Sequence, residues 1–434
     1  MSPQGEAAAA WPDSLWRSTA PDQTQHPPLN GHIDSDVLVI GAGFTGLNAA
    51  LKLSEAGTSV TVLDAGDVGW GASGRNGGQV NPMLPFNSPD MLSQLLGATY
   101  FERLTTTSLN SADELFDLIR SHQINCQARQ HGWLRVNHND RSRRKSETNI
   151  KDWNAFGAGM TLIEGDQLFK LSGTQAYSSG VITPRGGAVQ PLMLAQGIGA
   201  AARRNGAVIH GTSPVLSLDQ QAGKWEAKTE NGSVTADWVV VATNGYTDSL
   251  LPQLSKSIIP ITPIQIATGP LPEDVIGSIL PEGHTISDSR RIIMYARREP
   301  DNRMVYGGMG KPGPKGEITG FDWLQRDVER VFPQLKGVTW MHRWGGRIAF
   351  TDDHLPHLHE PRKGLLVGLG YNGRGVAMSN VMGRVMAERV LGADPGSLAF
   401  PVTQIKPIPM RGIKVMGMNS AIWVMRLMDY LETR

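Results

Sequence analysis

The feature that most constrains the fold of this chain is a strand, a glycine-rich turn and a helix that follow one another near residue 40. The β-forming run 36–40 leads directly into the turn 41–46, which reads Gly-Ala-Gly-Phe-Thr-Gly. Apolar residues at helical spacing then predict a helix over about 45–56, and a second β-forming run, 59–63, ends in Asp64. This order of elements predicts a βαβ unit that binds a dinucleotide.

Each glycine of the turn, and the acid after the second strand, has its own task in such a unit. Gly41 permits the tight turn, Gly43 lets a pyrophosphate approach the main chain, and Gly46 lets helix and strand pack closely. The phosphates are expected at the positive N-terminus of the helix. Asp64 is placed to accept hydrogen bonds from a ribose 2′-hydroxyl, which favours FAD or NAD over NADP.

Composition and charge exclude several other classes of protein. Lys and Arg number 41 against 40 Asp and Glu, a balance that argues against a nucleic-acid partner. Cys126 is the only cysteine, so no intramolecular disulfide forms, which is typical of a reducing compartment. We recognise no secretory signal and no run apolar enough to span a bilayer, and therefore expect a cytoplasmic protein.

The stretch after Asp64 favours FAD over NAD. Residues 69–79 read Gly-Trp-Gly-Ala-Ser-Gly-Arg-Asn-Gly-Gly-Gln, which is dense in glycine and in polar donors. This segment resembles the amine-oxidising flavoproteins that include D-amino-acid oxidase, glycine oxidase and sarcosine oxidase, and within them the γ-glutamylputrescine oxidase-like branch. In that family the segment runs along the flavin end of FAD.

Further segments carry the same resemblance. Residues 239–246 form an apolar strand and a small-residue turn similar to the one that covers the nucleotide, and 214–215 resemble the position that reads the adenine edge. Residues 364–376 are a strand that runs into a glycine-rich helix start, which in the family faces the flavin N1 and C2 carbonyl. Residues 344–356 match the usual approach to that strand.

The resemblance implies an α/β fold in which a Rossmann-like FAD-binding domain, of the glutathione-reductase type, is interleaved with an α+β substrate domain built on an antiparallel sheet. Trp11 and Trp16 are expected to anchor an N-terminal arm to the body. The expected segments are the arm 1–33, the FAD-binding segments 34–85, 180–250 and 343–396, the substrate segments 86–179 and 251–342, and a C-terminal tail 397–434.

FAD is expected to bind without a covalent link. The position that compares with the flavin-linked cysteine of monomeric sarcosine oxidase is Arg347, and Cys126 lies elsewhere. No metal is expected, because Pro356 interrupts the histidine-rich run 352–360. The FAD-binding residues that the resemblance implies are Gly41, Gly43, Phe44, Thr45, Gly46, Asp64, Ala65, Gly71, Ala72, Ser73, Arg75, Asn76, Gly77, Gly78, Gln79, Val215, Ala242, Thr243, Asn244, Gly345, Gly370, Asn372, Gly373, Arg374, Gly375 and Val376.

The implied reaction oxidises an amine to an imine by hydride transfer to the flavin N5, and water then hydrolyses the imine. Tyr295 and Tyr246 are the catalytic candidates, and Arg374 would stabilise negative charge on the reduced flavin. Arg75 or Arg297 would bind a substrate carboxylate, with ordinary ion pairing as the alternative. The substrate-pocket candidates are Arg75, Tyr295, Arg297, Trp344 and Tyr371, and core packing is the alternative for each aromatic residue.

Two departures from the family guide the expected substrate and electron acceptor. A lysine that holds the substrate carboxylate in sarcosine oxidase is absent from 376–378, which favours a polyamine derivative or a secondary or cyclic amine. No lysine stands at 304–306, where some oxidases of the family place one to activate oxygen, so the acceptor is O2 or a respiratory or quinone acceptor. An NAD-linked dehydrogenase and an FAD-binding protein without turnover remain alternatives.

The methionine-rich stretch 413–431 predicts an amphipathic helix. It is expected to pack on the body or on a second copy of the chain in a homodimer. Contact with a membrane surface on its cytoplasmic side is the alternative, which would suit delivery of electrons to a respiratory chain.

Overall fold

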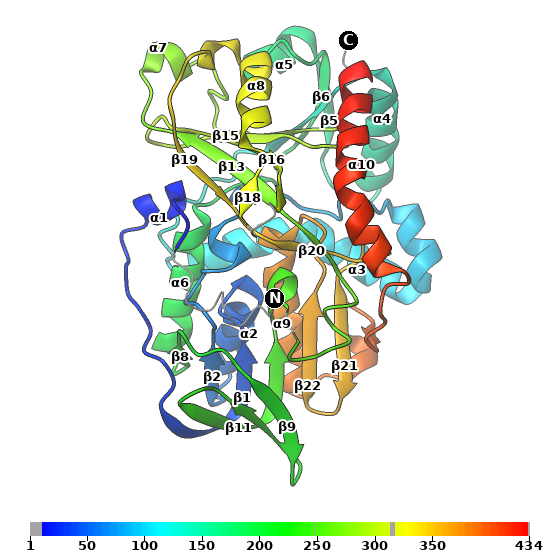
Figure 1. Cartoon of the computed structure of the whole chain (residues 1–434). Coiled ribbons are helices and arrows are strands. Elements are labelled where there is room, and N and C mark those ends of the chain that lie inside the picture. Colours follow the sequence, from blue (N-terminus) through cyan, green and yellow to red (C-terminus); the bar gives the residue numbers. More distant parts are fainter. Residues whose placement is uncertain (1–10, 248, 313–316, 433–434) are drawn as a thin grey trace.

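The structure, a computed structural model, describes residues 11–247, 249–312 and 317–432 of the 434-residue chain. The first ten residues of the expected arm lie outside the described residues. Two large sheets lie one above the other in Figure 1, with helices around them.

The first sheet has nine strands and is built around the predicted βαβ unit. Its central strands run parallel, and its order is β23-β21-β22-β11-β1-β2-β8, with the β9–β10 hairpin joined to β11. The strands are β1 (Gly31–Ile40), β2 (Val60–Leu63), β8 (Val208–His210), β9 (Ser217–Gln221), β10 (Lys224–Lys228), β11 (Gly232–Val241), β21 (His357–Arg362), β22 (Leu365–Leu369) and β23 (Val402–Thr403).

Both faces of the first sheet are covered, which explains why its central strands are continuous apolar runs. On one face α2 (Phe44–Glu55) packs between α6 (Pro191–Arg204) and α9 (Gly375–Val390), and α3 (Pro89–Ser121) packs on α9. On the other face, Trp225 of the hairpin packs with Leu254 and Ile258 against the strands. The carboxyl ends of β1, β2, β11 and β22 therefore meet at one edge, from which the chain turns toward the second sheet (Figure 1).

The second sheet has eight strands in the order β19-β13-β16-β15-β14-β4-β6-β5 and is antiparallel except at the β14–β4 pair. Its outer face packs on α8, with Leu324 and Val328 fully buried. The strands are β4 (Trp133–Asn137), β5 (Thr161–Glu164), β6 (Ser179–Thr183), β13 (Pro263–Thr268), β14 (Thr285–Asp288), β15 (Tyr295–Arg298), β16 (Met304–Met309) and β19 (Trp340–Gly345). The helices beside it are α4 (Asp140–Asn154), α5 (Gly165–Ser172), α7 (Glu273–Ile276) and α8 (Phe321–Val331).

The remaining strands form three small two-stranded sheets. They are β3 (Gln79–Val80) with β7 (Gly187–Ala188), β12 (Ile259–Ile261) with β20 (Ile348–Phe350), and β17 (Lys311–Pro312) with β18 (Ile318–Thr319).

The expected fold class, a Rossmann-like parallel sheet combined with an antiparallel-sheet α+β part, is confirmed. The expected domain boundaries stay a prediction, and two strands cross them. Strand β6 lies almost wholly in the expected FAD-binding segment 180–250, yet its partners are β4 and β5 of the second sheet. Strand β19 passes the expected boundary at 343 and pairs with β13.

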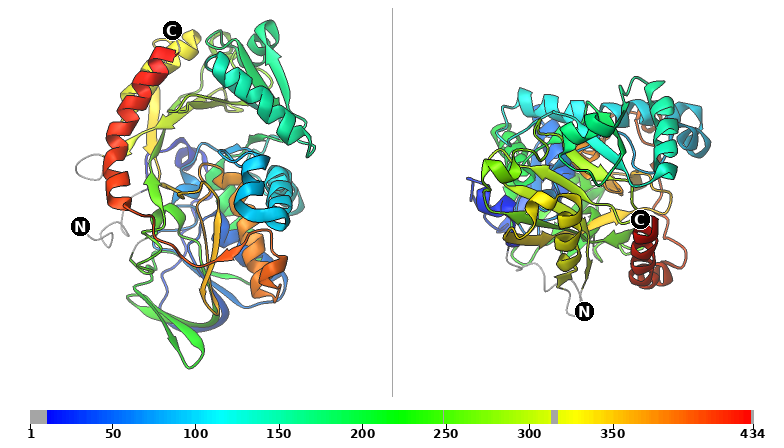
Figure 2. Two further views of the ribbon diagram at one scale, coloured as in Figure 1. Left: turned by 90° about the vertical axis from the view of Figure 1, so that its right-hand side faces the viewer. Right: turned by 90° about the horizontal axis from the view of Figure 1, so that it is seen from above.

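Both ends of the described chain are attached to the body. Trp16, in the short helix α1 (Leu15–Thr19), is fully buried, and its indole nitrogen donates to the Asn76 carbonyl at 2.8 Å. The C-terminal helix α10 (Arg411–Glu432) runs along the outside from the first sheet to the second (Figure 2). Near its end, Asp429 binds Arg291 at 3.1 Å. Within the described ranges, we find no helix with the length and apolar character needed to cross a membrane.

Candidate active site

A cavity of about 470 Å³ lies where the carboxyl edge of the first sheet faces the second sheet. Residues from both sheets line it, so the predicted nucleotide unit and the predicted substrate segments share one space. Of the residues predicted from the sequence, those that line it are Gly41, Gly43, Phe44, Thr45, Asp64, Ala65, Gly71, Ala72, Ser73, Asn76, Gly77, Gln79, Val215, Ala242, Thr243, Asn244, Tyr246, Tyr295, Tyr371, Asn372, Gly373, Arg374, Gly375 and Val376.

The start of helix α2 forms one end of the cavity. Gly41 has a left-handed φ of +110°, and a Cβ at Gly46 would overlap the Gly41 carbonyl oxygen, so both positions require glycine. The helix has no side-chain cap at Gly43 and no acid in its first turn. The Phe44 N–H donates to the Ser73 hydroxyl at 2.8 Å. The positive end of the helix and the N–H groups that follow Phe44 are therefore what it offers to an anion.

Asp64 directly follows β2 beside this turn. Its carboxylate accepts hydrogen bonds from the Ala42 N–H at 2.6 Å and from the Gly66 N–H at 2.8 Å. Burial nevertheless raises the pKa of Asp64 to about 6, because the loss of water outweighs these two donors. Val215 also lines the cavity, and its place at the adenine edge stays a prediction.

The segment 71–77 is folded so that its main chain faces the cavity. The Asn76 side chain donates to the Ala72 and Ser73 carbonyls at 3.1 and 2.8 Å, and its oxygen accepts from the Gly78 N–H at 2.7 Å. A Cβ at Gly77 would come within 2.7 Å of the Tyr295 ring. The glycines here let main chain and an aromatic ring approach closely.

Tyr295 enters the cavity from β15. Its hydroxyl accepts from the Gln265 amide nitrogen at 2.5 Å and donates to the Ile264 carbonyl at 3.3 Å. A Cβ at Gly307, directly opposite on β16, would overlap its ring. Burial raises the pKa of the Tyr295 phenol, so the group is neutral in the ordinary pH range.

Two more predicted aromatic residues line the cavity, both with their hydroxyls engaged. The Tyr371 hydroxyl lies 2.5 Å from the Thr45 hydroxyl and so joins the starts of α9 and α2. The Tyr246 hydroxyl accepts from the Arg347 N–H at 3.2 Å. Its ring meets Trp70, another cavity residue, edge to face at 5.7 Å.

The loop between β22 and α9 brings a second helix start to the cavity. Asn372 has a left-handed φ of +50°, and its side chain donates to the Gly370 carbonyl at 2.5 Å and accepts from the Thr351 N–H at 3.0 Å. Helix α9 begins at Gly375, with no acid in its first turn and no side-chain cap at Arg374. A second positive helix end therefore faces the same space as α2.

Three predicted substrate residues do not line the cavity, because each is used in packing. Arg297 is 1% exposed and binds Glu299 bidentately, and it donates to the Gly78 carbonyl at 2.9 Å. Arg75 donates to the Trp70 carbonyl at 2.7 Å, and Trp344 donates to the Arg75 carbonyl at 3.0 Å. For Arg297 the structure shows the alternative of ion pairing, and this geometry does not support a role in binding a substrate carboxylate. The predicted cofactor residues outside the lining are Gly46, Arg75, Gly78, Gly345 and Gly370.

Sequence reasoning missed a group of polar cavity residues that come from the second sheet. Arg135 and Trp133 lie on β4, Ser287 on β14, and Arg290 and Arg291 in the loop that follows β14. Alternation along β4 could have placed Trp133 and Arg135 on one face, but no local pattern told which face meets the first sheet.

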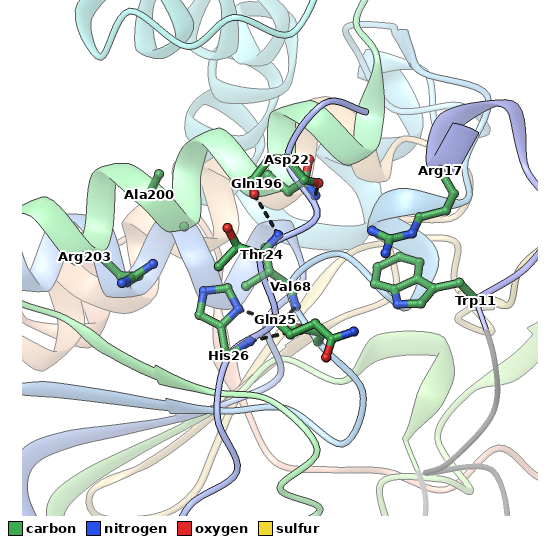
Figure 3. Close-up of a pocket in the computed structure, with 12 residues that line it drawn as sticks. Trp11, Arg17, Asp22, Thr24, Gln25, His26, Val68, Gln196, Ala200 and Arg203 are labelled. Carbon is green, nitrogen blue, oxygen red and sulfur yellow. Dashed lines mark hydrogen bonds and ion pairs between the residues drawn. The ribbon is translucent and has the colours of Figure 1, made fainter. Parts of the chain in front are cut away.

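A second, much smaller cavity of about 30 Å³ lies between the N-terminal arm and α6 (Figure 3). His26 pairs with Asp67 at 2.6 Å, and the Gln196 amide donates to the Asp22 carbonyl at 2.8 Å. The first contact holds the arm against the segment that follows β2, and the second holds it against α6. We assign the cavity no chemistry.

Comparisons with known proteins show what this chain is similar to. The family model of the FAD dependent oxidoreductases, the DAO family, matches residues 36–389. The gamma-glutamylputrescine oxidoreductase of Escherichia coli K12 is 31% identical over 398 residues, which cover 91% of this chain and 93% of that protein. The probable oxidoreductase OrdL of Haemophilus influenzae is 32% identical over 377 residues, or 85% and 86% of the two chains. The crystal structure of glycine oxidase from Geobacillus kaustophilus shares the fold, with a TM-score of 0.73 and 19% sequence identity. The match covers 86% of this chain and 100% of that chain.

Proposed function

This chain belongs to the FAD dependent oxidoreductase family, and from that premise we propose that it oxidises an amine to an imine, which water hydrolyses. The gamma-glutamylputrescine oxidoreductase, at 31% identity over nearly the whole chain, supports an amine substrate such as a polyamine derivative. Because the family is FAD dependent, the alternative of an NAD-linked dehydrogenase is not retained.

The observation that carries the proposal is the single cavity shared by two helix starts and by Tyr295 of the second sheet. The residues fit FAD: Gly41 and Gly46 form a cradle that a Cβ would fill, and Asp64 stands at the end of β2. In this proposal the α2 start holds the pyrophosphate, Asp64 the ribose, and residues 71–77 and the α9 start the flavin end. Bound FAD would supply the acceptor for the hydride that leaves the carbon next to nitrogen.

We propose that FAD is held without a covalent link to cysteine. Cys126 is 1% exposed and belongs to the hydrophobic core rather than to the cavity lining. Burial raises the pKa of its thiol to about 12, so a thiolate is disfavoured as well.

The walls of the cavity favour the neutral form of an amine. An alkylamine with a pKa of about 10.4 must lose a proton before its lone pair can assist hydride departure, at a cost of about 4 to 5 kcal/mol at pH 7. Tyr295, Tyr246 and Tyr371 remove water from the site, and removal of water lowers the pKa of a bound amine. A dedicated base is therefore unnecessary, and the positive α9 start with Arg374 stabilises the negative charge that reduction brings.

The electron acceptor is proposed to be a respiratory or quinone acceptor besides, or in place of, O2. None of the described residues that line the cavity is a lysine, and 304–306 of β16 are Met, Val and Tyr. Stopped-flow mixing of the reduced holoenzyme with air-saturated buffer tests this. Reoxidation at the rate of turnover would contradict it.

Anaerobic addition of amines to the purified holoenzyme tests the reaction itself. Gamma-glutamylputrescine, putrescine, N-methylglycine and proline are the first panel, and the readout is bleaching of the visible flavin absorbance. Bleaching by at least one amine, with release of the expected aldehyde or keto product, is the expected result. Failure with every amine, in a protein that carries a full complement of FAD, would favour the alternative of a binding protein without turnover.

Three expectations about the whole molecule remain proposals. They are the division into two interleaved domains, a cytoplasmic location, and contact of the C-terminal tail with a second copy or a membrane surface. The exposed apolar side chains of α10, among them Met416 at 75% and Leu431 at 62%, support the last.

A further inference from the structure

We propose that helix α10 and the segment 86–95 bind the surface of an anionic membrane, so that the cavity between the two sheets lies next to the lipid. This inference rests on the contact proposed above for the C-terminal tail and commits that contact to one partner. It does not depend on which amine the protein oxidises. Figure 2 shows α10 at the outer boundary of the molecule in both views.

Exposed apolar side chains gather on these two segments. Of the 18 large hydrophobic side chains that are exposed in the described chain, three lie in 86–95 and eight in 410–431. The first range holds Phe86, Met91 and Leu95, and the second begins with Met410, Ile413 and Met416, which are 71%, 64% and 75% exposed. Apolar surface gathered in this way marks a site that binds a partner or a membrane.

The apolar side chains of α10 form a wide stripe along its 22 residues. At about 100° per residue, Ile413, Val424 and Leu431 fall on one side of the helix. Met416 lies on one flank of that side and Met428 on the other, so the stripe spans about 120°. A second helix needs only a narrow seam, whereas a stripe of this width suits a helix that lies in the plane of a bilayer surface.

The charges around the stripe favour anionic lipid over a second copy of the chain. No acidic residue occurs from 395 to 428. The cations of this stretch are Lys406, Arg411, Lys414 and Arg426. The two acids near the end of α10, Asp429 and Glu432, both bind Arg291, at 3.1 and 2.8 Å. A second copy would therefore bring cations against cations, whereas anionic headgroups supply the opposite charge.

Polar contacts attach α10 to the body and leave its apolar stripe exposed. Near the start of the helix, Lys414 donates to the Asp352 carboxylate at 2.5 Å. Further along, Arg426 donates to the Met309 carbonyl at 2.9 Å, and its guanidinium carbon lies 4.6 Å from the centre of the Trp323 ring. The attachment uses charged side chains, so the apolar ones remain available to lipid.

The same surface borders the cavity. Arg291 lines the cavity and is held by the end of α10. Phe86 also lines the cavity and is 48% exposed, so the cavity reaches the surface at this residue. The Phe86 ring packs on the Phe350 ring at 5.7 Å, and Asp352, which binds α10, lies two residues further along the chain. A membrane bound to both segments would place the cavity beside apolar molecules dissolved in the lipid, which include quinones.

Flotation of the oxidised holoenzyme with lipid vesicles, in the absence of any amine, tests the inference. Vesicles of phosphatidylcholine alone are compared with vesicles that also contain phosphatidylglycerol. We expect binding to the anionic vesicles that weakens as salt is added, and little binding to phosphatidylcholine, because each cation near an anionic surface raises the affinity about fivefold. Absence of binding to anionic vesicles, or equal binding to both kinds, would overturn the inference.

A matched pair of double variants locates the binding surface. Ile413→Glu with Met416→Glu puts charge into the apolar stripe, and we expect it to weaken binding to anionic vesicles about tenfold or more. Val208→Glu with Leu216→Glu makes the same change in charge on the first sheet, at side chains that are 47% and 55% exposed, and should bind as wild type does. An equal loss in the two double variants, or no loss in the first, would contradict the assigned surface.

A second matched pair tests the cations. Lys406→Gln with Lys414→Gln should weaken binding to anionic vesicles about tenfold or more and make it less dependent on salt. Lys224→Gln with Lys228→Gln, on β10 of the first sheet, removes the same charge and should have little effect. Binding that depends equally on the two pairs would mean that net charge, and not this surface, attracts the vesicles.

Further measurements separate the other outcomes. We expect Ile413→Glu with Met416→Glu to leave the oligomeric state unchanged in sedimentation velocity, and a dimer that this variant separates would assign the surface to a second copy instead. FAD content and melting temperature are measured for each variant, and Leu431→Glu, at a side chain 62% exposed, serves where the double variant does not fold. Because the vesicle assay contains no amine, failure of every amine leaves its result intact, and failure to bind vesicles leaves the proposed amine oxidation intact.

Discussion

Arg135 and Tyr295 lie on one cross-strand row of the second sheet, with Ser287 paired to both of them. The row continues through Gly307, which pairs with Tyr295, to Gln265, which donates to the Tyr295 hydroxyl. Residues opposite one another in such a row face the same side of a sheet. One face of the second sheet thus offers a cationic end and an aromatic end to the same cavity.

Gly307→Ala tests whether the Tyr295 ring must occupy its position. The added Cβ overlaps the ring, so we expect the ring to move, the rate of flavin reduction by a good amine substrate to fall, and stability to drop by about 1–3 kcal/mol. FAD binding should persist, because Gly307 does not line the cavity. Gly412→Ala, whose Cβ meets open space, is the control. A reduction rate equal to that of wild type would show that the ring position is not needed.

Gly46→Ala tests the cofactor cradle in the first sheet. Its Cβ overlaps the Gly41 carbonyl oxygen and comes within 3.0 Å of Val39, so helix α2 must move away from β1. We expect protein that is purified with little or no FAD and that binds added FAD weakly. Flavin fluorescence released on denaturation measures the content. A full complement of FAD in this variant would contradict the assigned role of the turn.

Asp64 gives the cofactor-free protein a predictable dependence on pH. Its pKa is about 6 in the folded protein against an ordinary 3.8, so the folded state binds the proton more tightly. The contribution of Asp64 to the free energy of unfolding therefore decreases as pH rises from about 4 to about 6, by roughly 3 kcal/mol at most. Urea unfolding of the apoprotein between these pH values measures the slope.

Asp64→Asn is the comparison for that experiment. The amide does not titrate, so the part of the slope due to Asp64 should disappear. An unchanged slope would show that other carboxyl groups cause it.

Tyr295→Phe separates a packing role from an acid–base role. The phenol pKa is raised by burial, so Tyr295 should not ionise below about pH 10. We expect kcat/KM to rise with pH toward the pKa of the substrate amine, in both wild type and Tyr295→Phe, because the neutral amine reacts. The phenylalanine variant loses the bond to Gln265 and should react more slowly at every pH. Loss of a titration step in this variant would instead assign the step to Tyr295.

Asp429→Ala tests how α10 is held to the second sheet. The Asp429 carboxylate is 4% exposed and accepts from the Arg291 and Ile292 N–H groups at 3.1 and 2.9 Å. Its removal leaves two main-chain donors without partners, so we expect a loss of about 2–4 kcal/mol and earlier proteolysis within α10. Glu432→Gln, at a more exposed position on the same helix, should cost much less.

The site residues fall into two groups: those that a short stretch of sequence identifies, and those whose place depends on packing between distant segments. The 41–46 turn and Asp64 could be predicted because the whole βαβ unit lies within a short stretch of chain, and each step of it is set by local conformational preference. Arg297 was predicted to be a substrate residue from its place on β15, but its depth and its partner Glu299 depend on the packing around it.

By itself, the sequence determined the nucleotide unit, the family resemblance and hence FAD. Only the tertiary structure decided which polar side chains of the second sheet line the cavity between the two sheets. A strand pattern shows that Trp133 and Arg135 share a face, but long-range pairing through Ser287 sets them beside Tyr295. The loop after β22 then brings Arg374 onto the Trp133 ring. Such contacts join segments far apart in the chain, and no local preference encodes them.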